Sequence, residues 1–169
     1  MTKAFVKLID GLPLKNPDAD IELTFDNNYL LIAETRPQGF KTITDNLFKI
    51  PLENVIDTIL TTQKEIMEKD KSVIGRGVVG GLLFGPAGLL LGGLSGIGKK
   101  SATEYTKIYI VSYVGSNGEV KNITFGMNKM MVRVTEKFDK LFTKKHSSVP
   151  KSAGVQSLLA SGGTSEIVL

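Results

Sequence analysis

Apolar and polar residues alternate along most of the chain, and this alternation predicts strands, because a half-buried strand turns every second side chain to the core. In IELTF, for example, Ile21, Leu23 and Phe25 share one face, and the turn DNN then leads into YLLIAET, which predicts a hairpin. By the same pattern we expect seven strands. They cover residues 4–9, 21–25, 29–35, 40–44 with a continuation at 47–50, 55–61, 104–115 and 119–127.

Pro51 follows the fourth of these strands. Proline has no N–H to donate to a neighbouring strand, so we expect Pro51 at an edge or a corner of the sheet.

From residue 127 onward the spacing of apolar residues becomes helical. Apolar residues then recur three or four positions apart, which predicts an amphipathic helix. They are Met127, Met130, Met131, Val134, Phe138, Leu141 and Phe142. Asn128 is placed to cap the start of the helix, and Lys144 and Lys145 suit its carboxyl end. We interpret the stripe as a cap on the local core, with a partner-binding face as the alternative.

The end of the chain loses this periodicity. Residues 147–169 are rich in Ser and Gly, which predicts a flexible tail. The last residues, EIVL, have the alternation needed to add a strand to a partner's sheet. His146 is the only histidine; it follows two lysines, and we expect it to be exposed to solvent.

A glycine-rich stretch interrupts the strand pattern. Ten of the chain's eighteen glycines lie between Gly75 and Gly98, and no charged residue occurs from Gly77 to Gly98. Its end, GLSGIGKKS, nearly matches the phosphate-binding loop G-x-x-x-x-G-K-[S/T]. Lys100 stands where the hydroxyl residue is required, and no parallel α/β pattern follows. Nucleotide hydrolysis is therefore the third of our hypotheses.

Glycine spacing carries a second interpretation. Gly77, Gly81 and Gly85 are four residues apart, and the spacing repeats after Pro86 at Gly88, Gly92 and Gly96. Residues four apart share a helix face, so each set predicts a bare strip that lets another backbone approach closely. Apolar residues flank the strips at Leu82, Leu83, Phe84, Leu89, Leu90 and Leu91. The pattern favours self-association; a hairpin packed on its own barrel, or a loose loop, is the alternative.

The same stretch is long enough to reach across a bilayer. Residues 78–97 are 20 residues without a charge, which as one helix extend about 30 Å. Arg76 precedes them, and Lys99 and Lys100 follow, placed to contact an anionic surface. A single crossing would put strands of one barrel on opposite sides of a membrane. We therefore expect two short helices that turn near FGPAG and return to the side they left.

Charge and composition narrow the function. The formal net charge is +4, and the excess of Lys and Arg lies after residue 98. Such an excess suits an anionic membrane surface or nucleic acid, and ordinary solvated surfaces are the alternative. The chain has no cysteine, which excludes a disulfide framework, a thiol nucleophile and a Cys-ligated metal centre. It has no apolar run near its start that would form a signal peptide, so we expect a cytoplasmic protein. No Ser, His and Asp set and no carboxylate cluster with metal spacing can be named. We therefore expect that the protein is not an enzyme, has no catalytic residues and binds no metal or cofactor.

Seven strands followed by one amphipathic helix is an order that resembles pleckstrin-homology (PH)-like and GRAM-like domains. FKIPLENVIDTIL, residues 48–60, resembles the stretch of bacterial PH-like domains that leads into the next strand. IYIVSYVGSNGEVKNITFGM, residues 108–127, resembles their last hairpin. Bacterial proteins of this kind resemble PH domains interrupted by a glycine-zipper hairpin, and we expect a bacterial or phage protein.

The resemblance implies a mainly β (α+β) fold, a bent barrel of about seven strands with a C-terminal helix and an inserted glycine-rich helical hairpin. The chain then divides into barrel residues 1–72, insertion 73–100, last strands and helix 101–146, and tail 147–169. Members that bind phosphoinositides use a basic cluster in the first loop. The corresponding DGLPLKNPDAD has one Lys against three Asp, so we assign no lipid-binding residue there.

The function that the resemblance implies is a non-enzymatic interaction module. We expect it to self-associate through the glycine zipper as a homo-oligomer, at or near a membrane surface on its inner, cytoplasmic face. The alternative is a soluble adaptor that binds a protein or peptide through a barrel edge, the C-terminal helix or the tail, with a purely structural insertion. Nucleic acid is not an expected partner, because exposed aromatic residues do not interleave with the basic ones.

Overall fold

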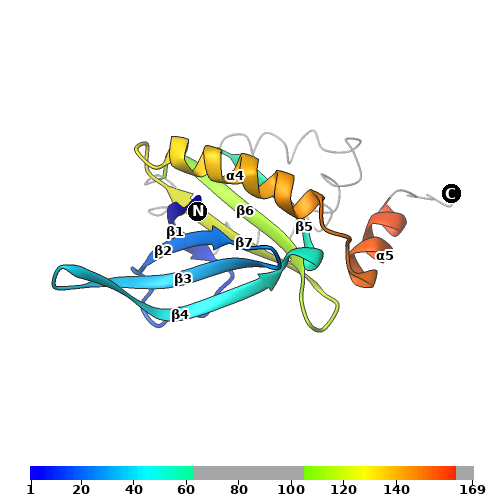
Figure 1. The fold of residues 1–169 in the computed structure, drawn as a ribbon, viewed down its shortest axis with the longest axis horizontal. Helices are drawn as coiled ribbons and strands as arrows, with labels where there is room; N and C mark the ends of the chain where they lie inside the picture. Colours follow the sequence, from blue (N-terminus) through cyan, green and yellow to red (C-terminus); the bar gives the residue numbers. More distant parts are fainter. Residues whose placement is uncertain (63–104, 163–169) are drawn as a thin grey trace, which may run out of the picture.

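The computed structural model of the 169-residue chain describes residues 1–62 and 105–162. Seven strands, a short 3-10 helix and two α-helices make up this part of the chain (Figure 1). The elements are β1 (Ala4–Asp10), β2 (Asp20–Phe25), β3 (Tyr29–Gln38), β4 (Lys41–Pro51), η1 (Leu52–Asn54), β5 (Val55–Thr61), β6 (Lys107–Val114), β7 (Val120–Met127), α4 (Val132–Ser147) and α5 (Ala153–Gly162).

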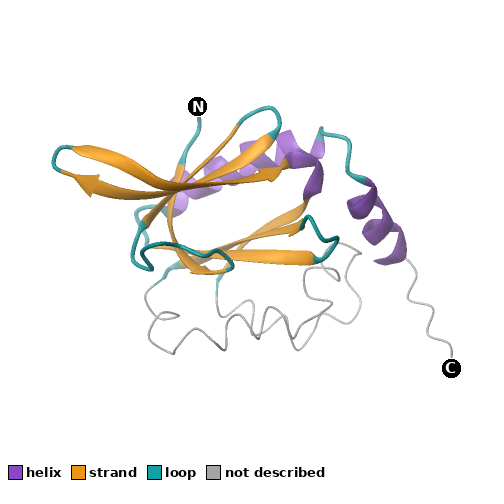
Figure 2. Cartoon of the chain, turned by 90° about the horizontal axis from the view of Figure 1, so that it is seen from below, coloured by secondary structure: helices purple, strands orange, loops and turns teal. Residues whose placement is uncertain are grey.

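All seven strands belong to one antiparallel sheet in the order β4-β3-β2-β1-β7-β6-β5. The sheet bends, so that its two halves lie over one another as two layers (Figure 2). The edge strands β4 and β5 do not pair, and the barrel is therefore open. The expected mainly β fold and bent barrel are confirmed. The expected helical hairpin, residues 73–100, lies outside the described residues.

One apolar core fills the space between the two halves. Ile21, Leu23, Leu30 and Ile32 from β2 and β3 join Tyr109, Val111, Ile123 and Phe125 from β6 and β7 in a single buried cluster. Phe138 and Phe142 of α4 are fully buried against them. Burying each such ring contributes about 1.5–3 kcal/mol, which is why the helix stays on the open barrel.

Two details of β4 agree with expectation. The continuation expected at 47–50 belongs to the same strand, β4, which begins at Lys41 and has a register shift opposite Glu34 and Thr35. Pro51 is the last residue of β4, and β4 is an edge strand, as the missing N–H of proline predicts.

Helix α4 begins later than its pattern indicated. It starts at Val132, and Asn128 is not its cap. Instead, Oδ1 of Asn128 accepts hydrogen bonds from the backbone N–H groups of Met130 and Met131, at 3.1 and 3.2 Å. Because Met127 still belongs to β7, the chain uses residues 128–131 to turn from the sheet into the helix.

The buried face of α4 also differs from the predicted stripe. Thr135, Phe138, Phe142 and His146 are buried. Three members of the predicted stripe are exposed instead, with exposed fractions of 76%, 38% and 39%: Met130, Val134 and Leu141. The expectation that the whole stripe caps the core is therefore wrong for these three.

Helix α5 occupies part of the segment for which we predicted a flexible tail. Its Val155 is fully buried and packs with Ile56 and Val114, on the side of β5 and β6 opposite the core. The backbone N–H of Ser152 donates to the carbonyl of Glu53 at 3.0 Å, just before the helix. The tail prediction is wrong for residues 153–162, because its few apolar residues meet an apolar patch formed by distant strands.

Candidate functional site

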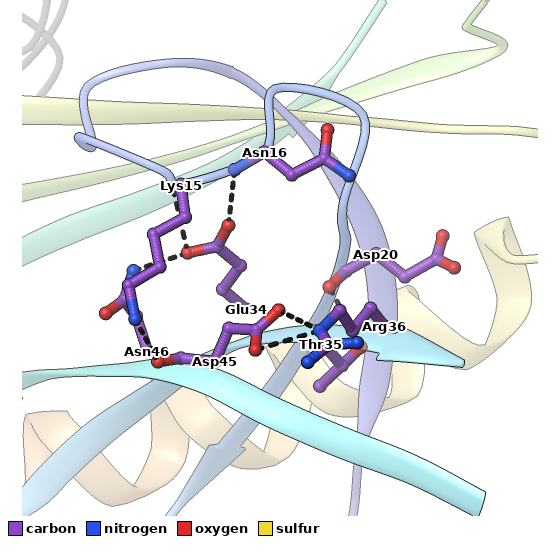
Figure 3. A network of polar contacts seen from close by, with 8 residues as sticks. All are labelled: Lys15, Asn16, Asp20, Glu34, Thr35, Arg36, Asp45 and Asn46. Atoms are coloured by element: carbon purple, nitrogen blue, oxygen red, sulfur yellow. Dashed lines mark hydrogen bonds and ion pairs between the residues drawn. The ribbon is translucent and has the colours of Figure 1, made fainter. Parts of the chain in front are cut away.

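The loop between β1 and β2, where PH-like domains that bind phosphoinositides carry their basic cluster, is fastened to a buried carboxylate. Glu34 of β3 accepts hydrogen bonds from the backbone N–H of Asn16 at 2.8 Å and of Lys15 at 3.2 Å, and from Nδ2 of Asn46 at 2.6 Å (Figure 3). Burial disfavours the charge of Glu34, but these hydrogen bonds outweigh it and lower the pKa of the carboxyl group. Glu34 therefore holds the loop as an anion.

The cations around this loop are engaged within the fold. Nζ of Lys15 donates to the carbonyl of Asp45 at 3.2 Å, and Nε of Arg36 contacts the carboxylate of Asp45 at 2.8 and 3.0 Å (Figure 3). Nζ of Lys7 donates to the carbonyl of Asp18 at 2.6 Å and pairs with Asp20 at 2.8 Å. The loop thus presents no cluster of cations to a phosphate group, which agrees with the acidic composition of DGLPLKNPDAD.

Sequence reasoning did not single out Glu34, although a signal was present. Leu30, Ile32 and Glu34 alternate along β3, and all three are fully buried. A carboxylate that continues an apolar alternation marks a buried charge, which must find hydrogen-bond donors.

A hollow of about 540 Å³ lies beside Tyr105 and Gly126. The ring of Tyr105 packs directly on Gly126, so that a Cβ built at Gly126 would overlap the ring. Other residues lining the hollow are Phe5, Lys7, Asp20, Asn128 and Met131. Lys7 and Asp20 pair with each other. The hollow is therefore mainly an apolar surface, and its charged side chains already have partners.

A polar cluster under α4 brings together groups that could resemble a catalytic site. Asp139 accepts hydrogen bonds from the hydroxyls of Tyr109 and Thr58, at 2.9 and 2.7 Å. Burial first, and then the charge of Asp139, raise the pKa of Tyr109 well above its usual value. The phenol stays protonated and acts as a donor, and the cluster joins α4 to the sheet.

His146 is buried, and the expectation that it is exposed to solvent is wrong. Its ring packs on Phe142 with 5.1 Å between ring centroids, and its Nδ1 lies 3.3 Å from Nζ of Lys151. Burial, followed by the charge of Lys151, lowers the pKa of His146 to about 4. After α4 the chain turns and places Lys151 beside the histidine. The local sequence did not indicate this contact.

The residues predicted to form the self-association and membrane-contact site lie outside the described residues. These are Gly77, Gly81, Gly85, Gly88, Gly92, Gly96, Leu82, Leu83, Phe84, Leu89, Leu90, Leu91, Arg76, Lys99 and Lys100. The strands on either side of them are described. Thr61, at the end of β5, pairs with Ile108, near the start of β6, so the chain leaves and rejoins the sheet at neighbouring positions.

Within residues 1–62 and 105–162, no group of three or more His, Cys, Asp or Glu side chains is arranged to hold a metal ion. The helices of the same residues include none that is long and apolar enough to pass through a bilayer.

Residues 14–127, well over half of the chain, match the sequence profile described as a glycine zipper containing PH domain. The chain belongs to this family. The match contains β2 to β7 and the whole glycine-rich stretch, and it ends at the last residue of β7, before α4. PH-like domains are generally non-catalytic, so membership supports a non-enzymatic interaction module. Neither the curated proteins nor the solved structures that were searched gave a match.

Proposed function

We propose that this PH domain is a non-enzymatic module that self-associates through its glycine zipper, at or near a membrane surface on the cytoplasmic side. The contact strips are Gly77, Gly81 and Gly85, and Gly88, Gly92 and Gly96, with the neighbouring leucines and Phe84 as apolar flanks. Arg76, Lys99 and Lys100 would contact anionic headgroups at the two ends of the segment.

The observation that carries the proposal is the pairing of Thr61 with Ile108. Because the segment between β5 and β6 starts and ends at adjacent strands, it has to return to the side that it left. A return excursion of two short helices would bring the two glycine strips into antiparallel reach of each other or of a second copy. Bare strips of this kind are a packing device for close helix contacts, and glycine is otherwise unfavourable in a water-exposed helix, by about 1 kcal/mol each relative to Ala.

Analytical ultracentrifugation of the full chain, with and without detergent or liposomes, tests the proposal. Replacing Gly81 and Gly92 by Leu puts bulky side chains on both strips and should shift the protein towards the monomer. Replacing Gly75 and Gly98 by Leu is the matched control, since neither glycine lies three or four residues from a glycine of the strips, and it should leave the oligomer largely intact. A full chain that is monomeric under all of these conditions contradicts the proposal.

A soluble adaptor is the second candidate, and β4 favours it. This strand forms one edge of the sheet, and Phe40, next to its start, is fully exposed, while Leu47 within it is 50% exposed. An exposed edge with apolar side chains can accept an extended peptide as an added strand. The adaptor hypothesis expects the Gly81 and Gly92 replacements to alter stability but to leave the oligomeric state and lipid binding unchanged.

A further inference from the structure

The side of α4 that faces away from the core carries a continuous row of positive charge. Its residues lie three or four positions apart, on one face of the helix and of the turn before it, and all are exposed. They are Lys129, Arg133, Lys137, Lys140 and Lys144. Figure 1 shows α4 lying along the sheet, and the side of the helix opposite the row, with Phe138 and Phe142, is the one buried in the core.

These five cations have no ion pair among residues 1–62 and 105–162. The two acidic residues of the helix are occupied elsewhere: Glu136 pairs with Lys107 of β6 at 2.9 Å, and Asp139 accepts the hydroxyls of Tyr109 and Thr58. The positive row is thus not neutralised by its own helix.

An apolar row runs beside the basic one. Met130, Val134 and Leu141 lie four and seven positions apart and are 76%, 38% and 39% exposed. Phe138 and Phe142 fill the core-facing side of the helix, and this second apolar row is not part of the core cluster. The outer surface of α4 is therefore itself amphipathic, with a basic and an apolar edge.

We propose that this outer surface of α4 docks on an anionic phospholipid membrane. A helix that lies in the interface buries its apolar edge at the boundary of headgroups and acyl chains, while long Lys and Arg side chains extend to the phosphates. The charge of the row is complementary to such a surface and to no neutral one. Nucleic acid would use the charge but leave the apolar row exposed, and the exposed part of the helix offers no aromatic ring for base stacking.

The location of the helix agrees with this orientation. The pair between Lys107 and Glu136 fixes the first turns of α4 beside the start of β6, close to the point where the glycine-rich segment rejoins the sheet. The surface lies beyond the residues that match the family profile. The inference rests on the membrane part of the proposed function, and not on self-association.

Vesicle co-sedimentation of the full chain tests it, with phosphatidylcholine vesicles and with phosphatidylcholine vesicles that contain phosphatidylglycerol. Each cation near an anionic surface changes partitioning by about fivefold. The variant Lys137→Gln/Lys140→Gln should therefore partition about 30-fold less than the wild type on anionic vesicles. The matched control is Lys41→Gln/Lys121→Gln, which removes two exposed lysines from β4 and β7 and has the same net charge. It should stay close to the wild type.

The apolar row has its own matched pair. Leu141→Ser should reduce partitioning by about tenfold, whereas Leu47→Ser, at a leucine of similar exposure on β4, should not. An equal loss in both lysine variants would overturn the proposal, because net charge alone would then explain binding. Tight binding to duplex DNA together with none to anionic vesicles would overturn it in favour of nucleic acid.

The two proposals can fail separately. Sedimentation in the absence of vesicles measures self-association through the glycine strips, and the α4 variants should leave it unchanged. Equal binding of anionic vesicles by the wild type and by Lys137→Gln/Lys140→Gln would overturn the proposed docking surface on α4. It would leave membrane contact by the glycine-rich segment as the explanation of binding. A wild type that binds neither vesicle would overturn the membrane part of both proposals, and self-association would be judged by sedimentation alone.

Discussion

The hydroxyl of Tyr109 donates a hydrogen bond of 2.9 Å to Oδ1 of Asp139. Thr58 donates to the same oxygen at 2.7 Å, so a single carboxylate oxygen joins β5, β6 and α4. Tyr109 is fully buried, and its hydroxyl has no access to water that could replace a lost partner. This carboxylate therefore adds a polar link to the apolar attachment of α4 by Phe138 and Phe142.

Asp139→Ala should lower the free energy of unfolding by about 2–4 kcal/mol, because the buried hydroxyls of Tyr109 and Thr58 both lose their acceptor. Urea denaturation followed by circular dichroism measures the change. Tyr109→Phe should cost less, about 1 kcal/mol, since Asp139 keeps the hydrogen bond from Thr58. The double variant should lose less than the sum of the two single losses. A urea midpoint of Asp139→Ala equal to that of the wild type would contradict this role.

Glu34→Gln should loosen the loop between β1 and β2. The amide keeps the size of the side chain but loses the charge that accepts three hydrogen bonds, so we expect a loss of about 1–2 kcal/mol at neutral pH. The amide protons of Lys15 and Asn16, which donate to the carboxylate, should exchange faster with solvent, as hydrogen exchange measured by NMR would show. The amide of Leu23, paired within the sheet, is the control and should be unaffected.

The pH dependence of this effect has a defined sign. Because the folded state lowers the pKa of Glu34 below its ordinary 4.5, the stability that the carboxylate contributes is fully present above that pH and is lost as the pH falls through the folded-state pKa. The difference in stability between the wild type and Glu34→Gln should therefore shrink in acid. A difference that stays constant from neutral pH to pH 3 (about 1.5 units below the ordinary pKa) would show that the charge is not responsible.

Much of this fold follows from alternation, and the exceptions have physical causes. The strands were predictable because each buried residue, such as Leu23, Ile32 or Val111, belongs to a local run of alternating residues with one buried face. The helix was predictable too, but not its rotation. Both Val134 and Phe138 fit a helical stripe, and only the opening of the sheet, formed by distant strands, decides that Phe138 is buried and Val134 is not.

The parts of the candidate sites that sequence missed depend on contacts across long separations. The sequence suggests that His146 is solvated, because Lys144 and Lys145 precede it. After the chain turns, however, Lys151 lies against the His146 ring and donates to the carbonyl of Leu52. The same holds for Val155, whose partners Ile56 and Val114 come from two other strands. By contrast, the acidic character of the first loop could be taken from its composition, because its lone lysine could not form a basic cluster however the loop folded.

Acid should destabilise the protein through His146. The folded state lowers the pKa of His146 from 6.5 to about 4, so its contribution to stability is fully present above pH 6.5 and is lost as the pH falls towards 4, because only the unfolded chain then binds the proton. At about 1.4 kcal/mol for each pKa unit, the loss is about 3 kcal/mol. His146→Gln cannot titrate, and it should lose that much less stability over the same interval.

Urea unfolding at several pH values between 7 and 4 (bracketing the ordinary histidine range) measures both proteins. Acidic groups titrate alike in the two proteins, so the difference between their slopes isolates the histidine. Parallel stability curves for the wild type and His146→Gln would mean that His146 has the same pKa in the folded and the unfolded states, contrary to its burial beside Lys151.

Gly126→Ala should destabilise the sheet through Tyr105. A Cβ at Gly126 overlaps the ring of Tyr105, so the ring has to leave the strand surface, at a cost of about 1–3 kcal/mol. With Tyr105→Ala already present there is no ring to displace, and the added Gly126→Ala should cost little. A double-mutant cycle measured by thermal unfolding gives this coupling directly. If Gly126→Ala costs the same with and without the ring, then β7 requires glycine for its backbone, and the packing of Tyr105 on Gly126 is not what restricts this position.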